Sequence, residues 1–192
     1  MDDIFKFAQL NLHRSDAPSL LFDRYCLLEN GYNGIVTGLK TGIVEVDRRH
    51  MLPRAEILIR KGHRYMVLNE FCSRDVVAIL TECVSESSTE RIIVCSAYLP
   101  GDDNLPVEFV KLLDYCHSNN RHLIIGCDAN AHHTIWGSTD IKECGEILLE
   151  ILVKNYISIM NTGTSPTIVA FVRREVLDLT LTTCFIGDML ES

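Results

Sequence analysis

The short apolar run HLIIGC, residues 122 to 127, constrains the fold of this chain more than any other feature. A strand that is apolar on both faces is typical of the centre of a sheet covered on both sides. The run ends abruptly in Asp128 and Asn130, and His132 and His133 follow directly. The sequence therefore predicts a central buried strand that delivers a group of polar side chains to one edge of its sheet.

Patterns of apolar and β-branched residues predict strands along most of the chain. The predicted strands cover residues 5–13, 54–62, 65–71, 75–84, 91–100, 122–127, 157–161 and 167–183, and the last run is interpreted as two strands joined near Arg173 and Arg174. Helical spacing predicts helices over residues 15–28, within 101–120 and over 145–155. The stretch 29–42, rich in Gly and Asn, predicts a loop. Helices that occur singly between strands favour an α+β fold, with a mixed sheet or two packed sheets and helices outside.

Length and composition predict one domain over residues 1–192. With 47% hydrophobic residues, the chain can bury a sizeable core but is short for two domains. No apolar run approaches the roughly 18 to 20 residues that cross a bilayer, and the start MDDIFKF carries acids where a signal peptide is basic. We expect an intracellular protein, cytoplasmic or nuclear, without a membrane partner.

Cysteine spacing and charge narrow the function classes. The eight cysteines never form a C-x-x-C pair, so we expect buried thiols and not structural zinc. A formal net charge of −8 argues against a free-standing nucleic-acid binder, whose affinity normally comes from Lys and Arg. Any nucleic-acid function must then rely on local features or on an attached basic domain.

Asp128 and Asn130 are the first candidates for chemistry. If the strand continued through both, their side chains would lie on the same side. A carboxylate and an amide oxygen at a rigid strand end suit Mg²⁺ or an attacking water. The alternative is that D-A-N-A only ends the strand in an Asx turn.

The neighbouring residues have a plainer interpretation. His132 and His133 are adjacent, so both cannot face one metal from a regular strand, and we interpret them as structural or substrate-edge residues. Trp136 is most simply explained by core packing. The absence of G-x-S-x-G, Walker A and G-x-G-x-x-G motifs disfavours nucleophilic hydrolases, P-loop enzymes and dinucleotide binders.

Four segments together resemble a known family. QLNLHRS, SAYLPGDD, LIIGCDANAHHTIWGSTD and VLDLTLTT occur in the order seen in the endonuclease domain of insect non-LTR retrotransposon polyproteins, part of the exonuclease–endonuclease–phosphatase family. The resemblance implies a four-layer α/β/β/α sandwich of two mixed sheets flanked by helices. It also implies a phosphodiesterase that depends on Mg²⁺ or Mn²⁺ and nicks a DNA substrate, leaving a 3′-hydroxyl primer for an attached reverse transcriptase.

The resemblance also assigns residues. Asn11 matches the family asparagine near the metal, and Glu29 is the nearest candidate for the metal-binding glutamate. Asp178 matches a late aspartate that helps to hold a catalytic histidine or the metal.

The remaining assignments concern the substrate. Tyr98 matches a residue that contacts the scissile phosphate. Asp128 and Asn130 match the pair that orients the attacking water and stabilises the transition state.

The sequence departs from the family pattern in two places. The segment before Glu29 is about ten residues shorter than in the family, and no Ser-Asp-His motif follows Asp178. We therefore expect a C-terminally incomplete domain that lacks its last strand and has impaired activity. Two alternatives stay open, namely a catalytically dead transposon-derived remnant that keeps the fold, and a phosphatase or phosphodiesterase acting on small phosphorylated molecules.

Overall fold

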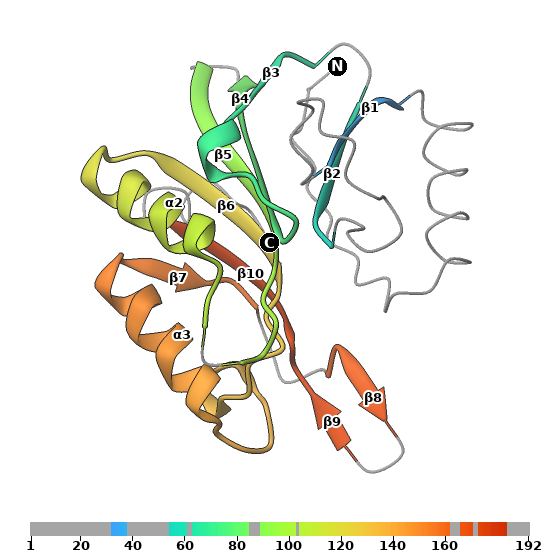
Figure 1. Cartoon of the computed structure of the whole chain (residues 1–192), viewed down its shortest axis with the longest axis vertical. Helices are drawn as coiled ribbons and strands as arrows, with labels where there is room; N and C mark the ends of the chain where they lie inside the picture. Colours follow the sequence, from blue (N-terminus) through green and yellow to red (C-terminus); the bar gives the residue numbers. More distant parts are fainter. Residues whose placement is uncertain are drawn as a thin grey trace.

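A six-stranded mixed sheet is the centre of the computed structural model, which describes residues 32–37, 54–60, 63–84, 89–102, 104–161, 166–170 and 173–183 (Figure 1). In spatial order its strands are β3 (Tyr65–Val67), β4 (Val76–Val84), β5 (Thr89–Tyr98), β6 (His122–Asp128), β10 (Asp178–Thr183) and β7 (Ile157–Ile159). Only β5 and β6 pair in parallel, and the other neighbours are antiparallel. The apolar run that the sequence places at the centre of a sheet is β6, between β5 and β10, so this prediction is confirmed.

Two helices cover one face of this sheet, α2 (Val107–Ser118) and α3 (Glu143–Lys154) (Figure 1). Their apolar residues recur at helical spacing, so each helix presents one apolar stripe to the strands. Phe109, Leu112 and Leu148 are fully buried in the main core, together with alternate residues of β5, β6 and β10. The two helices therefore fix which side chains of each strand point into this core.

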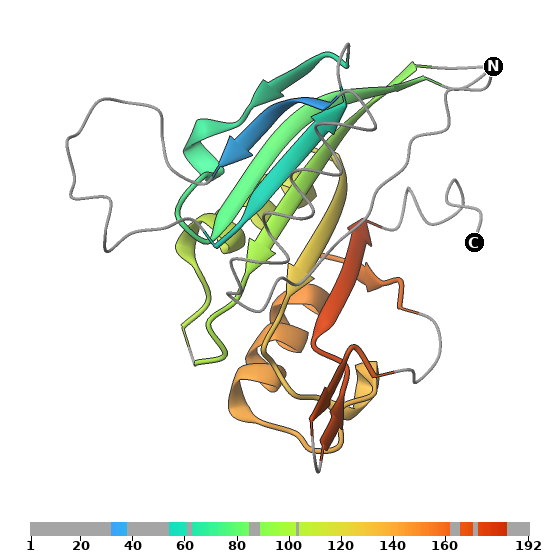
Figure 2. The same ribbon diagram turned by 90° about the vertical axis from the view of Figure 1, so that its right-hand side faces the viewer.

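The opposite face of the sheet carries a second layer of strands. β2 (Glu56–Arg60) pairs antiparallel with β1 (Tyr32–Thr37), and Figure 2 shows this pair in front of the large sheet. Ala55 and Ile59 pack with Val77 and Ile124 in a second buried cluster. Two packed sheets with α2 and α3 on one outer side confirm the predicted α+β sandwich for these three layers, and the described residues do not include a helix layer on the other side. The strand predicted over residues 5–13 and the helix over 15–28 lie outside the described residues.

Three local predictions are wrong. Part of the stretch 29–42 is strand β1 and not loop. Despite the glycines of the stretch, its β-branched segment Ile35-Val36-Thr37 pairs with β2. The last apolar run holds three strands, β8 (Ile168–Ala170), β9 (Arg173–Glu175) and β10, so Arg173 and Arg174 lie within a strand. The predicted strand 65–71 is β3 followed by the 3-10 turn η1 (Asn69–Phe71).

The described cysteines agree with the expectation of buried thiols, apart from the half-buried Cys83. The six cysteines in the described ranges are free, and five of them are buried. Burial raises the pKa of the Cys116 thiol to about 12 and places that of Cys95 well above its ordinary value, so neither is a reactive thiolate. Among the described helices, none has the length and apolar character needed to cross a membrane.

Candidate active site

Three of the predicted site residues lie side by side on adjacent strands. In the strand register, Tyr98 at the end of β5 is level with Asp128 at the end of β6, and Asp178 at the start of β10 is directly opposite Asp128. Residues that are level in neighbouring strands point to the same face of a sheet. Cys127 and Leu179, one position along, belong to the main core on the helix side, so the row formed by Tyr98, Asp128 and Asp178 faces the β1–β2 layer.

Backbone hydrogen bonds fix the strand ends that carry this row. Leu99 N–H donates to the Asp128 carbonyl at 2.8 Å, and Ala129 N–H donates to the Leu177 carbonyl at 2.8 Å. Asn161 holds the start of β10 from the other side. Its Nδ2 donates to the Asp178 carbonyl at 2.9 Å, and its Oδ1 accepts from the Thr180 N–H at 2.8 Å. The row therefore stands on three mutually bonded strands and not on a free loop.

Asn130 reaches this edge of the sheet by a route that strand alternation does not predict. Strand β6 ends at Asp128, and Asn130 has a left-handed backbone with φ of 46°, so the prediction that a continuing strand places both side chains on one side is wrong. Its Nδ2 donates to the Leu99 carbonyl at 3.0 Å, which ties it to the loop after Tyr98. Asparagine tolerates this conformation better than most residues do.

Gly101 allows these two loops to meet. It has φ of 79°, and a Cβ atom there would lie 2.8 Å from the Asn130 carbonyl oxygen. Only a glycine avoids both the backbone strain and the overlap. The glycine of the SAYLPGDD segment is thus explained by contact with the D-A-N segment.

The facing pair Asp128 and Asp178 is the electrostatic feature of this edge. An Oδ1 atom of each carboxylate is buried, and that of Asp178 makes no hydrogen bond within the described part of the chain. Like charges directly opposite one another in a sheet are destabilising. The two charges also act on Cys127, where burial raises the pKa of the thiol most, followed by the neighbouring Cys95 and then by Asp128 and Asp178. An orphaned buried carboxylate oxygen beside a second carboxylate is the donor set that a hard divalent cation prefers.

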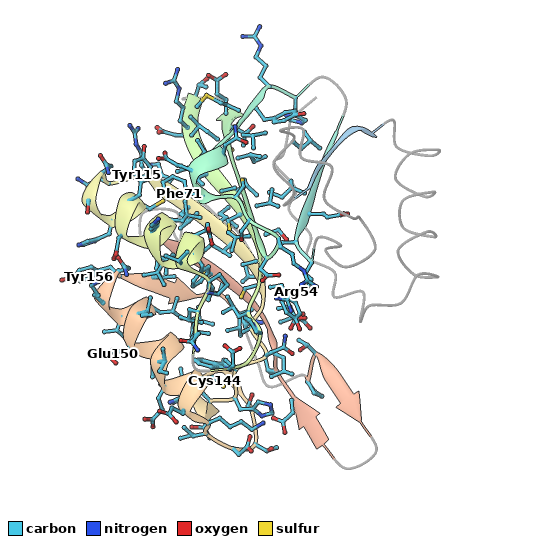
Figure 3. The ribbon with its side chains drawn as sticks, viewed as in Figure 1. Arg54, Phe71, Tyr115, Cys144, Glu150 and Tyr156 are labelled. Atoms are coloured by element: carbon cyan, nitrogen blue, oxygen red, sulfur yellow. The ribbon has the colours of Figure 1, made fainter. Side chains whose placement is uncertain are left out.

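A cation from the second sheet layer borders the row. Arg54, labelled in Figure 3, lies just before β2. Its guanidinium carbon is 4.2 Å from the centre of the Tyr98 ring. The same guanidinium donates through Nε and Nη2 to the two carboxylate oxygens of Asp75. The hydrogen bond to Asp75 raises the pKa of Arg54, so this group stays charged. The sequence analysis assigned nothing to Arg54 or Asp75, and no local motif marks either of them.

His132 belongs to a separate buried cluster beyond β6. Its Nδ1 lies 2.7 Å from Asp140 Oδ1 and 3.6 Å from Glu175 Oε2, and one ligand atom from each of the three residues lies within 4.8 Å of the others. Glu175 accepts from the backbone N–H and the hydroxyl of Thr139 at 2.9 and 2.6 Å. These two hydrogen bonds lower the pKa of Glu175. The internal bonds account for the cluster, which ties β9 to the loop after β6.

His133 and Trp136 are also structural, in agreement with the sequence interpretation. His133 Nδ1 accepts from the Ile135 N–H at 3.1 Å and so caps the 3-10 turn η2 (Thr134–Trp136). The buried Trp136 indole donates to the Ala131 carbonyl at 3.0 Å and lies against the His133 ring. Neither ring belongs to the row of Tyr98, Asp128 and Asp178.

The structure thus brings four of the six predicted site residues to one edge of the sheet, namely Tyr98, Asp128, Asn130 and Asp178. Asn11 and Glu29, the predicted metal-binding residues, lie outside the described residues, and their places in the site stay predictions.

Solved structures with the same architecture identify the class. The endonuclease domain of TRAS1, a telomere-specific non-LTR retrotransposon, superposes with a TM-score of 0.59 at 22% identity over 72% of this chain. The chain spans 63% of the length of that domain. The sandwich therefore has a fold of the exonuclease–endonuclease–phosphatase type.

A family model then gives the narrower assignment. The model described as endonuclease-reverse transcriptase matches residues 92–187, half of the chain, and the chain belongs to that family. Curated protein sequences give no match. Human Nocturnin, with bound sulfate, matches at 13% identity over 90% of this chain and 66% of its own, with a TM-score of 0.47. Zebrafish (D. rerio) TDP2, complexed with single strand DNA product, matches at 8% identity over 88% and 67%, with a TM-score of 0.44.

Proposed function

We propose that this chain is a metal-dependent phosphodiesterase that nicks DNA and leaves a 3′-hydroxyl, from which a reverse transcriptase in the same polyprotein primes synthesis. The observation that carries the proposal is the facing pair Asp128 and Asp178 with Tyr98 on the next strand. Membership of the endonuclease-reverse transcriptase family supports the choice of DNA and of the polymerase partner.

The donor set fits a divalent cation. The buried, orphaned Oδ1 of Asp178 and the neighbouring carboxylate of Asp128 are hard oxygen ligands, and Asn11 and Glu29 are proposed to complete the set. Bound Mg²⁺ or Mn²⁺ would supply positive charge that stabilises the developing negative charge on the phosphate oxygens.

Asp128, Tyr98 and Asn130 have separate roles toward the water and the phosphate in the proposed reaction. In the proposed reaction a water attacks phosphorus and gives up a proton, the bond from phosphorus to the 3′ oxygen breaks, and that oxygen leaves and takes up a proton from solvent to become the 3′-hydroxyl. The phosphate stays on the 5′ end of the other DNA fragment. Asp128 accepts a hydrogen bond from the water and orients it, while the Tyr98 hydroxyl donates to a non-bridging oxygen. Asn130 uses one Nδ2 hydrogen on Leu99 and has a second that can donate to the phosphate.

The histidines next to the row are not assigned as acid or base. Nδ1 of His132 is engaged with Asp140, and Nδ1 of His133 accepts from a backbone N–H. Their contacts explain both residues as supports of the loop after β6.

The test is a plasmid-nicking assay with a matched acid control. Purified protein with Mg²⁺ should convert supercoiled plasmid to relaxed circles, and the nicks should support extension by a DNA polymerase without end treatment, since a 3′-hydroxyl is present. We expect Asp128→Ala to lower the rate by about 10²-fold or more, because it removes a group that acts on the reacting water. Asp114→Ala removes an exposed carboxylate from α2 and should leave the rate unchanged.

The competing functions give different results in the same experiment. Equal nicking by wild type and Asp128→Ala would assign the activity to a contaminant and contradict the proposal. Release of phosphate from a soluble inositol phosphate without nicking would favour the small-molecule phosphatase. Absence of both reactions, together with a melting temperature that does not respond to Mg²⁺, would favour the inactive remnant.

A further inference from the structure

Arg54 stands out among the charged groups near the proposed site because one neighbouring segment, Arg74 and Asp75, holds both its backbone and its side chain. Its backbone N–H donates to the Arg74 carbonyl at 2.8 Å, while its guanidinium donates through two nitrogens to the Asp75 carboxylate. Both side chains of this ion pair are largely buried, with exposed fractions of 19% and 18%. A bidentate pair of this kind fixes the plane of the guanidinium as well as its position.

The guanidinium group of Arg54 also packs against the ring of Tyr98. The guanidinium carbon lies 4.2 Å from the centre of the phenol ring, within the range of a cation–π contact. Asp75 also controls the backbone there, because its carbonyl accepts from the Tyr98 N–H at 2.8 Å. One acid therefore fixes Tyr98 twice, directly through the main chain and indirectly through the ring that packs on Arg54.

We infer that Arg54, oriented by Asp75, is a positioning residue for Tyr98 that holds the phenol ring in line with Asp128 for contact with the substrate phosphate. The inference rests on the proposed function, and it adds two residues that the sequence analysis did not assign. Arg54 acts through Tyr98 and not by a contact of its own with the reacting atoms.

The geometry makes a charge-only role distinguishable from a positioning role. Lysine keeps the positive charge but has no planar fork to pair with both Asp75 oxygens while packing on a ring. Misplacement of a reacting contact by about 1 Å can reduce a rate by 10²-fold. Arg54→Lys and Arg54→Ala should therefore both lower kcat on the order of 10- to 100-fold, with KM nearly unchanged.

A double-mutant cycle tests whether Arg54 acts through Tyr98. In a Tyr98→Ala background, replacing Arg54 should cause little further loss of kcat, because the ring that it positions is already gone. Arg91→Ala is the matched control. Arg91 on β5 faces Glu82 on β4 in an exposed ion pair, with nitrogen and oxygen 3.9 Å apart. That variant should nick at the wild-type rate.

Two kinetic results would overturn the inference. A wild-type kcat for Arg54→Lys would mean that charge alone suffices. Losses from Arg54→Ala and Tyr98→Ala that multiply in the double variant would mean that Arg54 contacts the substrate independently. Either result leaves the proposed nuclease intact, because wild type would still nick.

A second readout does not depend on turnover. In protein labelled with ¹⁵N-arginine, the Arg54 Nε–H should give a signal that exchanges slowly, because it donates to Asp75, and that is shifted upfield by the Tyr98 ring. Tyr98→Leu should abolish the upfield shift, and Asp75→Asn should accelerate exchange. If wild type fails to nick but these shifts appear, the positioning contact is supported and the proposed function fails. An Arg54 signal that ignores both substitutions overturns the inference.

Discussion

Asp178→Asn tests whether the facing carboxylates form a site that needs a cation. Asp178 and Asp128 are direct cross-strand partners, and each has a buried Oδ1. Cross-strand pairs contribute roughly 0.2–1 kcal/mol, and we take about 1 kcal/mol of repulsion because both side chains are half-buried. In EDTA, removal of this repulsion should raise the melting temperature by about 2–4 °C for a domain of this size.

Added Mg²⁺ should reverse the order of the two proteins. At 100 times its dissociation constant, a bound ion stabilises wild type by about 2.7 kcal/mol, which corresponds to a shift of about 5–11 °C. The Asp178→Asn variant loses a charged ligand and should shift by less. Thermal melts followed by circular dichroism in EDTA and over a Mg²⁺ series measure both effects.

Two results of these melts would refute the reasoning. A variant that melts below wild type in EDTA would mean that the two carboxylates do not repel one another in the folded chain. Equal stabilisation of both proteins by Mg²⁺ would mean that Asp178 is not a ligand. Asp114→Asn changes charge on the exposed side of α2 and controls for the change in net charge.

Two further substitutions test the loops that support the site. Gly101→Ala should cost about 1–2 kcal/mol of stability for the left-handed backbone alone. It should also slow nicking, because the new Cβ would displace Asn130. Gly137→Ala is the control: Gly137 has a comparable backbone, with φ of 95°, but lies outside this contact, so it should lose stability without the added loss of nicking. Glu175→Gln should remove a stabilisation that exists above the ordinary pKa of 4.5 and disappears as pH falls through the lowered pKa of the folded state. In urea unfolding at pH 7, 5 and 3, the difference in unfolding free energy between wild type and variant should therefore shrink as the pH falls. A difference that stays constant would contradict the role given to the Thr139 hydrogen bonds.

The sequence predicted the parts of the fold that depend on local pattern. The apolar run of β6 and the helical spacing of α2 and α3 each report which faces are buried, and the structure confirms them. Strand β1 was missed because Gly34 and the glycines that flank the strand in the sequence are typical of a loop, and its extended form depends on pairing with β2, about twenty residues further along the chain. The break before β10 was missed because the charged residues Arg173 to Glu175, interpreted as the join between two strands, are themselves the short strand β9.

The candidate site divides in the same way. Tyr98, Asp128 and Asp178 could be named from motifs, but their alignment follows from the strand register, which no local pattern contains. The resemblance named Asn130, but the expectation that strand alternation directs its side chain was wrong, because the residue has a left-handed backbone beyond the end of β6. Arg54 escaped the sequence analysis because its role depends on partners that join only in the folded chain.

The buried His132 cluster bears on the site although it takes no part in the proposed reaction. Glu175 lies three residues before Asp178, and Ser138 Oγ donates to the carbonyl of Val176 between them at 3.1 Å. The loop after β6 thus holds the segment that leads into β10 by side-chain bonds, while Ala129 holds it by a backbone bond. Because the facing pair requires Asp128 and Asp178 to stay level, these bonds keep the register on which the proposed cation site depends. His132, the first histidine of D-A-N-A-H-H, is therefore best explained as a support that aligns β6 and β10 and not as one of the residues that act on the substrate.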